Sequence, residues 1–553
     1  MTWKILTKNK IINILIFTII LLLAVVVRFL CIDKISGLWY DELVMYNQAF
    51  QSSLKKVVVT ALSEDVHLPL YQICLYCWGN IFGFSDFALR SFSAICGILT
   101  VVTGFFIGKT LKSNFCGFLI MGIFAVNSFL IYYSQEVRMY ELLALFSALN
   151  LLCLAKIYKK EISKFWYGAW VISATGLILT YTIAILYVLG QLLFFIILKR
   201  KELLIPSCVL GVLNLPVIVY LIVFSEKFSN FITGFYSDWS SLFVALQNFF
   251  TPKLVGLGTN PPHYLKEFFV NLNFVDFIFV ILPIIISLFF IFLAVKKNKF
   301  AKFLLMISLV FLFVEIFAFI LTDFKILSRY LILILPNLLV LVGLGVEEYK
   351  NKLGITLISL FLVLNLSYLF GFENSAFKLQ RTGFLPLSNL LIKSDVSDND
   401  VVIVWNRKEV LSKYFDKKVF VFSILKDFAY KSEFILDNEI QLNNFDENGK
   451  KEFLREYFKS GTVPMNTLIL LQYLTTGMHK DQKLVIAVDE YFDNFNQEKF
   501  LKIVDNDIDY KNISYNNLIT LKSLLDLRFI CDKNLRYKGS EKSDSFVVYI
   551  YEK

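Results

Sequence analysis

Two short segments of this chain hold polar residues whose types and spacing could carry out chemistry. In Gly37–Glu42, the carboxylates of Asp41 and Glu42 follow aromatic residues that favour a membrane–water interface. In Tyr132–Tyr140, Arg138 lies among more polar residues than a plain turn needs. A carboxylate can take up a proton, and a guanidinium can bind a phosphate through paired hydrogen bonds. The two segments are therefore candidates for a site that handles a lipid-linked phosphate.

Each segment also has a simpler interpretation. The acidic pair is consistent with solvated side chains beside an aromatic belt, which composition alone favours. Arg138 is equally consistent with a long cationic side chain that extends toward lipid phosphates. Arg329, followed by Tyr330 at the start of a later apolar run, has the same two interpretations. Other parts of the chain must decide between them.

A third polar segment runs from Glu64 to Tyr71 and includes Asp65 and His67. An amphipathic stretch follows it as far as Phe82, and such a stretch can lie on the membrane surface and cover a site there. A lone histidine is more often a hydrogen-bonded loop residue than a ligand. Because the chain has only three His, a histidine-built metal site is not expected. A divalent cation held by carboxylates stays open, and no other cofactor is indicated.

The composition places these segments in a membrane protein. Of the 553 residues, 57% are hydrophobic and 18% are charged, which is too apolar for one soluble domain. The net charge of +10 comes from Lys and Arg gathered in short loops, so it does not indicate nucleic-acid binding. The eight Cys form neither a zinc-ligand pattern nor a disulfide framework.

Apolar runs long enough to cross about 30 Å of hydrocarbon recur through the first two thirds of the chain. We expect about eleven membrane-spanning helices, the first of them an uncleaved span rather than a signal peptide. The expected spans lie near residues 11–31, 87–108, 114–132, 139–156, 165–181, 183–198, 204–225, 274–295, 303–322, 329–347 and 353–371. The chain is thus predicted to be a polytopic α-helical membrane protein.

The distribution of positive charge predicts the orientation of these spans. Lys and Arg gather in alternate loops, and the cytoplasmic loops of membrane proteins hold such residues. We therefore expect a cytoplasmic N-terminus in a cell membrane. The outer side receives loops 32–86 and 226–273, the turn 133–140 and everything after about residue 372. The candidate segments all fall on that side.

The last third of the chain has a different composition. Charged residues mix with short apolar runs after Gly371, so residues 1–371 are expected to form the membrane domain and residues 372–553 a soluble, extracytoplasmic α/β domain. The expected strands lie at Val401–Trp405, Val419–Phe422, Thr467–Leu471, Leu484–Val488 and Phe546–Tyr549. Helical segments between these strands complete the α/β pattern.

Taken in order, these segments resemble the polyprenyl-phosphate-sugar-dependent glycosyltransferases of the protein O-mannosyltransferase and lipid A aminoarabinose transferase superfamily. The resemblance rests on the acidic pair after the first span, the segment His67–Tyr71, the start of the second span at Phe87–Arg90 and the turn Tyr133–Tyr140. It covers about the first 150 residues, and Leu68 departs from the proline often found there. The resemblance implies a C-type glycosyltransferase fold in a bacterial inner membrane.

The resemblance also implies roles for the candidate residues. Asp41 corresponds to the carboxylate at the reaction centre, where it accepts the proton of the acceptor hydroxyl, and Glu42 orients Asp41 or the acceptor. Arg138 and Arg329 are expected to bind the donor phosphate. Arg28 is a poorer third choice, which could pair with the acidic residues instead. The other substrate-binding candidates are Tyr133, Glu136, Tyr140, His67, Tyr71, Glu64 and Asp65, the last two being equally consistent with residues that face water.

The implied reaction transfers a sugar, with inversion, from a polyprenyl-phosphate donor to a hydroxyl of a glycolipid, a cell-envelope glycan or a protein. A polytopic lipid or glycan flippase is the main alternative. Against it, the only clear acid inside an expected span is Glu315, which either hydrogen-bonds a neighbouring helix or lines the site. A protein that merely anchors a C-terminal binding domain would not need so many spans.

Overall fold

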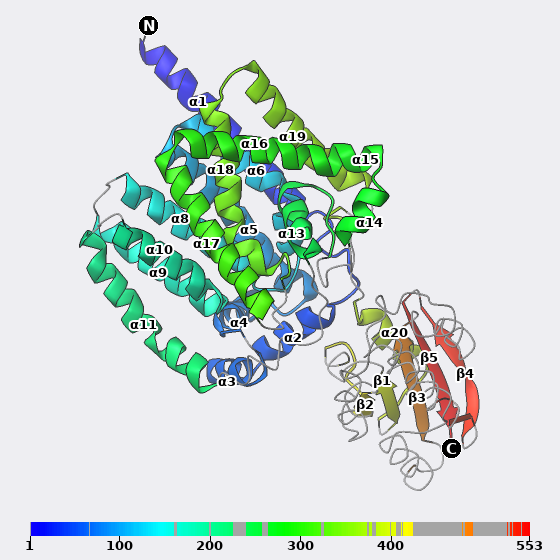
Figure 1. The fold of residues 1–553 in the computed structure, drawn as a ribbon. Coiled ribbons are helices and arrows are strands. Elements are labelled where there is room, and N and C mark those ends of the chain that lie inside the picture. Colours follow the sequence, from blue (N-terminus) through cyan, green and yellow to red (C-terminus); the bar gives the residue numbers. More distant parts are fainter. Residues whose placement is uncertain are drawn as a thin grey trace. The chain divides into compact units, whose positions relative to one another are not determined.

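The computed structural model describes most of the membrane part of the chain and the central strands of its C-terminal part (Figure 1). The described residues are 2–65, 67–159, 163–197, 201–224, 239–256, 264–321, 326–372, 375–378, 383–398, 400–404, 411, 413–423, 478, 482–489, 528, 531–532, 535–543 and 545–553. The chain divides into two compact units. The first comprises Met1–Lys34 and Met45–Gln380, and the second comprises Ile35–Val44 and Arg381–Lys553.

The first unit is built of helices. In chain order they are α1 (Thr2–Phe29), α3 (Leu54–Glu64), α4 (Leu70–Phe82), α5 (Asp86–Leu111), α6 (Asn114–Val126), α7 (Ser128–Tyr133), α8 (Tyr140–Tyr158), α9 (Lys164–Thr180), α10 (Ala184–Ile197), α11 (Leu204–Val223), α13 (Ser240–Phe250), α14 (Tyr264–Val270), α15 (Phe274–Asp276), α16 (Leu282–Lys297), α17 (Lys299–Leu321), α18 (Leu335–Glu348) and α19 (Lys352–Gly371). Helix α2 (Tyr40–Ala49) begins in the segment that groups with the second unit.

Eight of the described helices are long and apolar enough to cross a membrane. They are Lys10–Phe29, Asp86–Leu111, Tyr140–Tyr158, Leu204–Val223, Phe274–Lys297, Lys299–Ile320, Tyr330–Glu348 and Lys352–Gly371. The predicted polytopic helical membrane architecture is confirmed. The count of about eleven differs because some apolar runs do not form one long helix.

Three expected spans are interrupted or shorter helices, namely those near residues 114–132, 165–181 and 183–198. Asn127 breaks the first: its Oδ1 accepts a hydrogen bond from the Leu130 N–H at 3.0 Å, and its Nδ2 donates to the Phe249 carbonyl at 2.8 Å. Asn127 thereby caps the start of α7, which cannot continue α6. The other two runs form α9, of 17 residues, and α10, of 14. Hydropathy measures the length of an apolar run and does not detect such caps.

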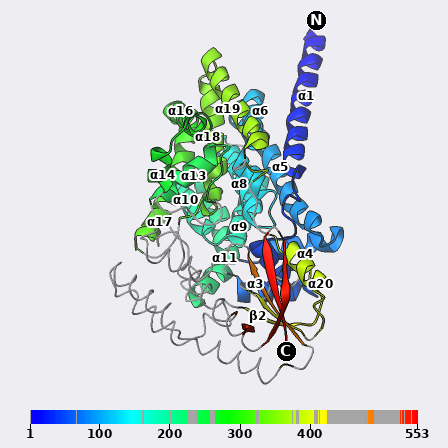
Figure 2. The ribbon, with the colours of Figure 1, turned by 90° about the vertical axis from the view of Figure 1, so that its right-hand side faces the viewer.

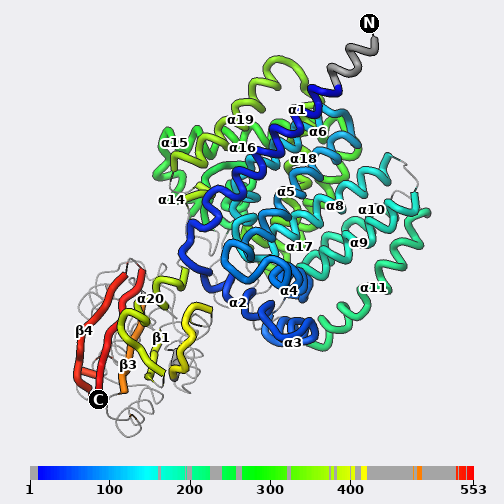
Figure 3. The backbone as a smooth tube through the Cα atoms, turned by 180° about the vertical axis from the view of Figure 1, so that it is seen from behind, coloured from blue at the N-terminus to red at the C-terminus, as the bar shows by residue number. Residues whose placement is uncertain are grey.

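Helices α5 and α8 form the centre of the first unit. Helix α5 packs against α6 and α8, and α1 packs against α5 and α6 (Figure 2). Helices α8, α9 and α10 lie side by side (Figure 3). A Cβ on Gly104 would lie 3.1 Å from the Phe124 ring, and one on Gly108 would lie 2.6 Å from the Cys116 carbonyl oxygen. Small residues thus let these helices approach closely, as is usual for helices that pack in lipid.

The amphipathic stretch expected after Tyr71 forms α4, which packs against α5 and α9. Its Trp78 Nε1 donates to the Ala88 carbonyl at 2.8 Å, which ties α4 to the first turns of α5. On the opposite face, Ile81 and Phe82 are exposed. This distribution is typical of a helix that lies at a membrane surface.

The second unit holds a mixed five-stranded sheet in the order β2-β1-β3-β5-β4. Its strands are β1 (Val401–Val404), β2 (Phe420–Ser423), β3 (Lys483–Asp489), β4 (Arg536–Lys542) and β5 (Phe546–Glu552). Strand β1 pairs in parallel with β2 and β3, whereas β5 pairs antiparallel with β3 and β4. Helix α20 (Leu385–Lys393) packs on β5. The prediction of a C-terminal domain with strands and helices is confirmed.

Four of the expected strands correspond to β1, β2, β3 and β5, and the fifth, Thr467–Leu471, lies outside the described residues. Strand β4 is not predicted from the sequence because its residues, RYKGSEK, are polar and mostly exposed. It occupies an edge of the sheet. Charged residues are common on edge strands because they discourage pairing with another chain.

Candidate active site

The turn between α7 and α8 positions the central candidate residues. Within Ser134–Met139, the Arg138 N–H donates to the Glu136 carbonyl at 2.9 Å. The Gln135 side chain holds this turn against α1, because its Nε2 donates to three carbonyls at the end of that helix, the Leu30 carbonyl at 2.8 Å. The last carbonyls of a helix lack partners within the helix, so Gln135 caps α1. One of the extra polar residues of the turn is therefore structural.

Aromatic rings and guanidinium groups meet beside this turn. The rings of Tyr133 and Tyr140 have their centroids 4.8 Å apart. The Arg138 guanidinium lies over the Tyr140 ring, 5.5 Å from its centroid. At the start of the span Tyr330–Glu348, the Arg329 guanidinium lies 5.5 Å from the centroid of the Tyr330 ring. The guanidinium of each arginine thus makes a cation–π contact with a tyrosine ring.

Tyr181, between α9 and α10, connects these groups to the loop before α4. Its ring centroid lies 6.1 Å from that of Tyr330 and 4.9 Å from that of His67. Tyr181 itself is 1% exposed. Segments far apart in the sequence therefore meet in one place, which we call the tyrosine–arginine cluster. Its members are His67, Tyr133, Glu136, Arg138, Tyr140, Tyr181, Glu315, Arg329 and Tyr330.

Electrostatic interactions connect the two arginines of this cluster. Burial, reinforced by the Glu136 charge, raises the pKa of Tyr133 well above its ordinary value, and the Arg329 charge opposes this rise. The charges of Arg138 and Arg329 both act on the Tyr330 hydroxyl. The side chains of Arg138 and Arg329 are only 8% and 7% exposed. Two buried cations close to the same phenol form a setting that favours a bound phosphate.

Glu315 reaches the same cluster from α17. Its charge acts on the Tyr181 hydroxyl, as does the charge of Arg329. The side chain is 2% exposed, and its Oε2 has no hydrogen-bond partner within the described part of the chain. A buried carboxylate oxygen without a partner is costly inside a membrane. The arrangement thus agrees better with a residue that lines a binding site than with one that bonds a neighbouring helix.

Asp41 and Glu42 lie in the first turn of α2, in the part of that helix that groups with the second unit. The Glu42 side chain is fully buried, and its Oε2 accepts a hydrogen bond from the Trp39 N–H at 3.2 Å. The Trp39 carbonyl accepts the bond from the Leu43 N–H, so Glu42 caps the start of the helix by reaching back to it. Asp41 is partly exposed. The two carboxylates therefore differ: Glu42 shapes the helix start, and Asp41 is accessible.

The contacts of Arg28 are those of a residue that holds two helices together. Its guanidinium donates to the Phe124 carbonyl at 3.1 Å and to the Ala125 carbonyl at 3.3 Å, at the end of α6. The side chain is completely buried, and a Cβ on Gly97 would lie 2.6 Å from its Nε. Glu141, another fully buried residue, supplies an opposite charge to it. This Arg28–Glu141 pair is not singled out by sequence reasoning, because neither residue lies in a recognisable motif.

The segment before α4 contributes fewer residues to the cluster than expected. Asp65 shapes the loop, since its Oδ1 accepts a hydrogen bond from the His67 N–H at 3.0 Å. Glu64 is exposed. The Tyr71 hydroxyl lies 3.3 Å from the Ser93 Oγ, and the ring packs within the helices. Of the four candidates in this segment, His67 is the one in ring contact with Tyr181.

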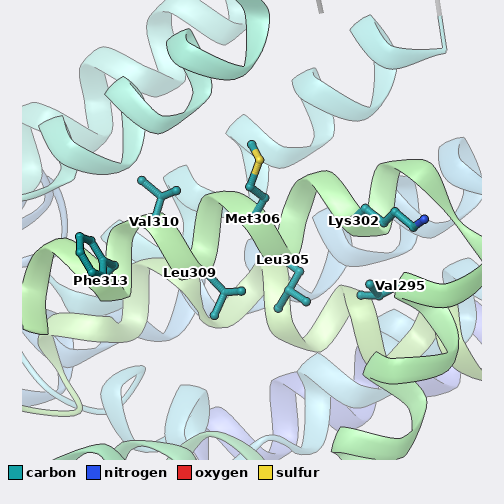
Figure 4. Close-up of a pocket in the computed structure, with 7 residues that line it drawn as sticks. All are labelled: Val295, Lys302, Leu305, Met306, Leu309, Val310 and Phe313. Carbon is teal, nitrogen blue, oxygen red and sulfur yellow. The ribbon is translucent and has the colours of Figure 1, made fainter. Parts of the chain in front are cut away.

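Among the described residues, no group of three or more His, Cys, Asp and Glu side chains could hold a metal ion. A groove of about 350 Å³ runs along α17, lined by Val295 of α16 and by residues of α17 between Lys302 and Phe313 (Figure 4). Apart from Lys302, its lining is apolar. A sugar needs several hydrogen-bonding groups, so the tyrosine–arginine cluster is the better candidate site.

Comparison with known proteins agrees with this arrangement. The model of the dolichyl-phosphate-mannose-protein mannosyltransferase family matches residues 67–226. ArnT from Cupriavidus metallidurans in the apo state matches with a TM-score of 0.56 at 11% identity, over 97% of each chain. The family model covers less than a third of the chain, and the likeness to ArnT, at this identity, shows a shared fold.

The chain also matches the structure of the same ArnT bound to undecaprenyl phosphate, with a TM-score of 0.55 at 11% identity and 97% of each chain covered. No curated protein sequence matches it. The family match includes His67, the α7–α8 turn and Tyr181, and the fold likeness extends over both units. The chain accordingly shares the fold of this membrane protein, as the sequence motifs predict, and its long apolar helices make it a multi-pass membrane protein.

The structural role of Arg28 can be tested with Arg28→Met. We expect a loss of about 3–5 kcal/mol in the free energy of unfolding, because the buried Phe124 and Ala125 carbonyls would lose their charged donor. Thermal unfolding in detergent measures the change. The double variant Arg28→Met with Glu141→Leu should recover part of the stability, because both charges are then absent. A lower affinity for the sugar donor at unchanged stability would instead show that Arg28 binds the donor.

Proposed function

We propose that the protein transfers a sugar from a polyprenyl-phosphate carrier, such as undecaprenyl phosphate, to an acceptor hydroxyl on the outer face of a bacterial inner membrane. The observation that carries this proposal is the meeting of Arg138 and Arg329 in a buried aromatic cluster. The match to the mannosyltransferase family model supports the class of donor, and the likeness to an ArnT bound to undecaprenyl phosphate supports the choice of carrier. The acceptor is a glycolipid, a cell-envelope glycan or a protein.

The two arginines are proposed to bind the donor phosphate. A guanidinium binds phosphate through paired hydrogen bonds and keeps its charge when buried. The Tyr133 phenol stays protonated because its pKa is raised, so it can donate a hydrogen bond to a phosphate oxygen. As the bond from the sugar to this phosphate breaks, the leaving phosphate gains charge, which the arginines stabilise. The reaction therefore needs no general acid, and no divalent cation is required for this step.

Asp41 is proposed to act as the base at the acceptor. The acceptor oxygen forms a bond to the anomeric carbon while the bond from that carbon to the phosphate oxygen breaks, and the hydroxyl proton passes to the Asp41 carboxylate. A carboxylate is a weak base, but the hydroxyl becomes acidic late in an oxocarbenium-like transition state. A single displacement of this kind inverts the anomeric centre. Glu42 acts indirectly, by capping the helix turn that presents Asp41.

Glu315 and His67 are proposed to contact the sugar or the acceptor. Both lie beside Tyr181, and the buried Glu315 Oε2 can accept a hydrogen bond from a hydroxyl group. A sugar offers several hydroxyl donors, so it can satisfy this carboxylate where water is scarce. We propose that the other candidates of this segment only stabilise the surrounding loop. They are Tyr71, Asp65 and Glu64.

The phosphate site can be tested with Arg138→Lys and Arg329→Lys. Each change should lower kcat/KM for a synthetic polyprenyl-phosphate sugar by about 10- to 100-fold, because lysine cannot make the paired hydrogen bonds. The assay follows labelled sugar into membrane extracts. Arg528→Lys is the matched control, since Arg528 lies over the Tyr549 ring in the second unit, 4.0 Å from its centroid. Full activity in both cluster variants would contradict the assignment.

The base can be tested with Asp41→Asn in the same assay. We expect kcat to fall by about 10²- to 10⁴-fold, because the amide cannot accept the hydroxyl proton, while the donor KM stays nearly constant. Glu267→Gln is the control, because Glu267 is an exposed carboxylate of α14. If Asp41→Asn transfers sugar as fast as the unchanged protein, Asp41 is not the base.

Glu315 can be tested with Glu315→Gln and Glu315→Leu. Glu315→Leu should raise the donor KM by about tenfold or more, because a hydrogen bond to the sugar is lost, and Glu315→Gln, which keeps an acceptor oxygen, should raise it less. Glu315→Leu should also raise the unfolding temperature, because it removes a buried carboxylate from an apolar helix. Lower stability with unchanged kinetics would show that Glu315 serves the helix packing and not the substrate.

A further inference from the structure

The C-terminal domain contains a short piece of the N-terminal loop. Residues Ile35–Val44 group with Arg381–Lys553 in the second compact unit, although more than 300 residues separate them in the chain. The contacts that hold this piece surround Leu38, whose side chain is fully buried. Asp41 follows three residues later. The acidic pair and the C-terminal domain are therefore parts of one packed unit.

Hydrogen bonds attach both polar backbone groups of Leu38 to this domain. The Leu38 N–H donates to the Tyr414 hydroxyl at 2.6 Å. The Leu38 carbonyl accepts a hydrogen bond from the Phe384 N–H at 3.2 Å. The Phe384 ring in turn stacks on Phe546, the first residue of β5, with centroids 5.9 Å apart. Leu38 is thus connected to strand β5 of the sheet through Phe384.

Two glycines permit the close approach of the chains. Gly37 has a φ of +84°, and a Cβ there would lie 2.7 Å from the Leu385 backbone nitrogen. A Cβ on Gly383 would collide with the Ser36 carbonyl oxygen. No larger residue fits either position without a shift of the backbone. Leu385 begins α20, which packs on β5, so the loop rests on the helix that covers the sheet.

We propose that the C-terminal domain is a positioning element for Asp41: it fixes Gly37 and Leu38, and thereby the first turn of α2. This inference rests on the proposed function, in which Asp41 takes the acceptor proton. A base must stay within hydrogen-bond reach of the hydroxyl, and a misplacement of about 1 Å can cost roughly 100-fold in rate. Tyr414, Gly37 and Gly383 are accordingly positioning residues, which act through Asp41 and not on the substrate.

The test uses the full-length protein with Tyr414→Phe, which removes one hydroxyl and keeps the ring. The matched control is Tyr537→Phe, because Tyr537 belongs to the same domain and its side chain is 49% exposed. Hydrogen exchange of the peptide that covers residues 36–43 measures how firmly the loop is held. We expect faster exchange in this peptide, a kcat lowered by about tenfold and a donor KM unchanged within about twofold, whereas the control changes none of these.

Two outcomes of this test would overturn the inference. Faster exchange with an unchanged kcat would overturn the inference, because the loop would then be released without consequence. Unchanged exchange would overturn it as well, because the Tyr414 hydroxyl would not hold the loop. Gly383→Ala provides a second, stronger displacement, and it should lower kcat further while the unfolding transition of the membrane unit is retained.

A comparison with Asp41→Asn separates this inference from the proposed function. If Asp41→Asn leaves transfer unchanged, both the base assignment and the positioning role fail. If Asp41→Asn abolishes transfer but Tyr414→Phe leaves kcat unchanged, only the positioning role fails. Where Asp41→Asn keeps measurable residual transfer, adding Tyr414→Phe should cost no further activity, because a positioning residue has no effect once its target is removed.

Discussion

The hydrogen bonds of Arg28 and Gln135 at the end of α1 hold the first unit in the form that the site requires. Arg28 donates to the last carbonyls of α6, and Gln135 donates to carbonyls at the end of α1. These groups are buried, and in an apolar medium an unpaired charge or carbonyl is costly. The ends of α1 and α6 can therefore pack together in few other arrangements. The α7–α8 turn occupies its position because of this constraint.

The position of that turn decides which side chains meet. Arg138 and Tyr140 lie on this turn, and the charge of Arg138 acts on Tyr330, which begins a span almost 200 residues later in the chain. The charge of Arg329 acts on the same phenol. Two buried cations that act on one phenol favour a bound anion over an empty site, which agrees with the proposed binding of a lipid phosphate.

The acidic pair is held by different means. Glu42 forms the cap of α2, while Leu38 and its neighbours are held by the Tyr414 hydroxyl, the Phe384 N–H and α20. Within the second unit, residues of the C-terminal part thus hold the segment that carries the proposed base.

The sequence by itself determined the membrane class, most of the long helices and the central strands, because apolar run length and charge distribution are local properties. The roles of the named site residues stay predictions. Only the tertiary structure decided that Arg28 serves helix ends, that Tyr181 contacts both His67 and Tyr330, and that Gly37–Leu38 pack on residues 383–385 and 414. These facts depend on contacts across long stretches of chain, and a single sequence does not encode them in any local pattern. Asn127 shows the same limit, because its cap interrupts an apolar run that hydropathy treats as one span.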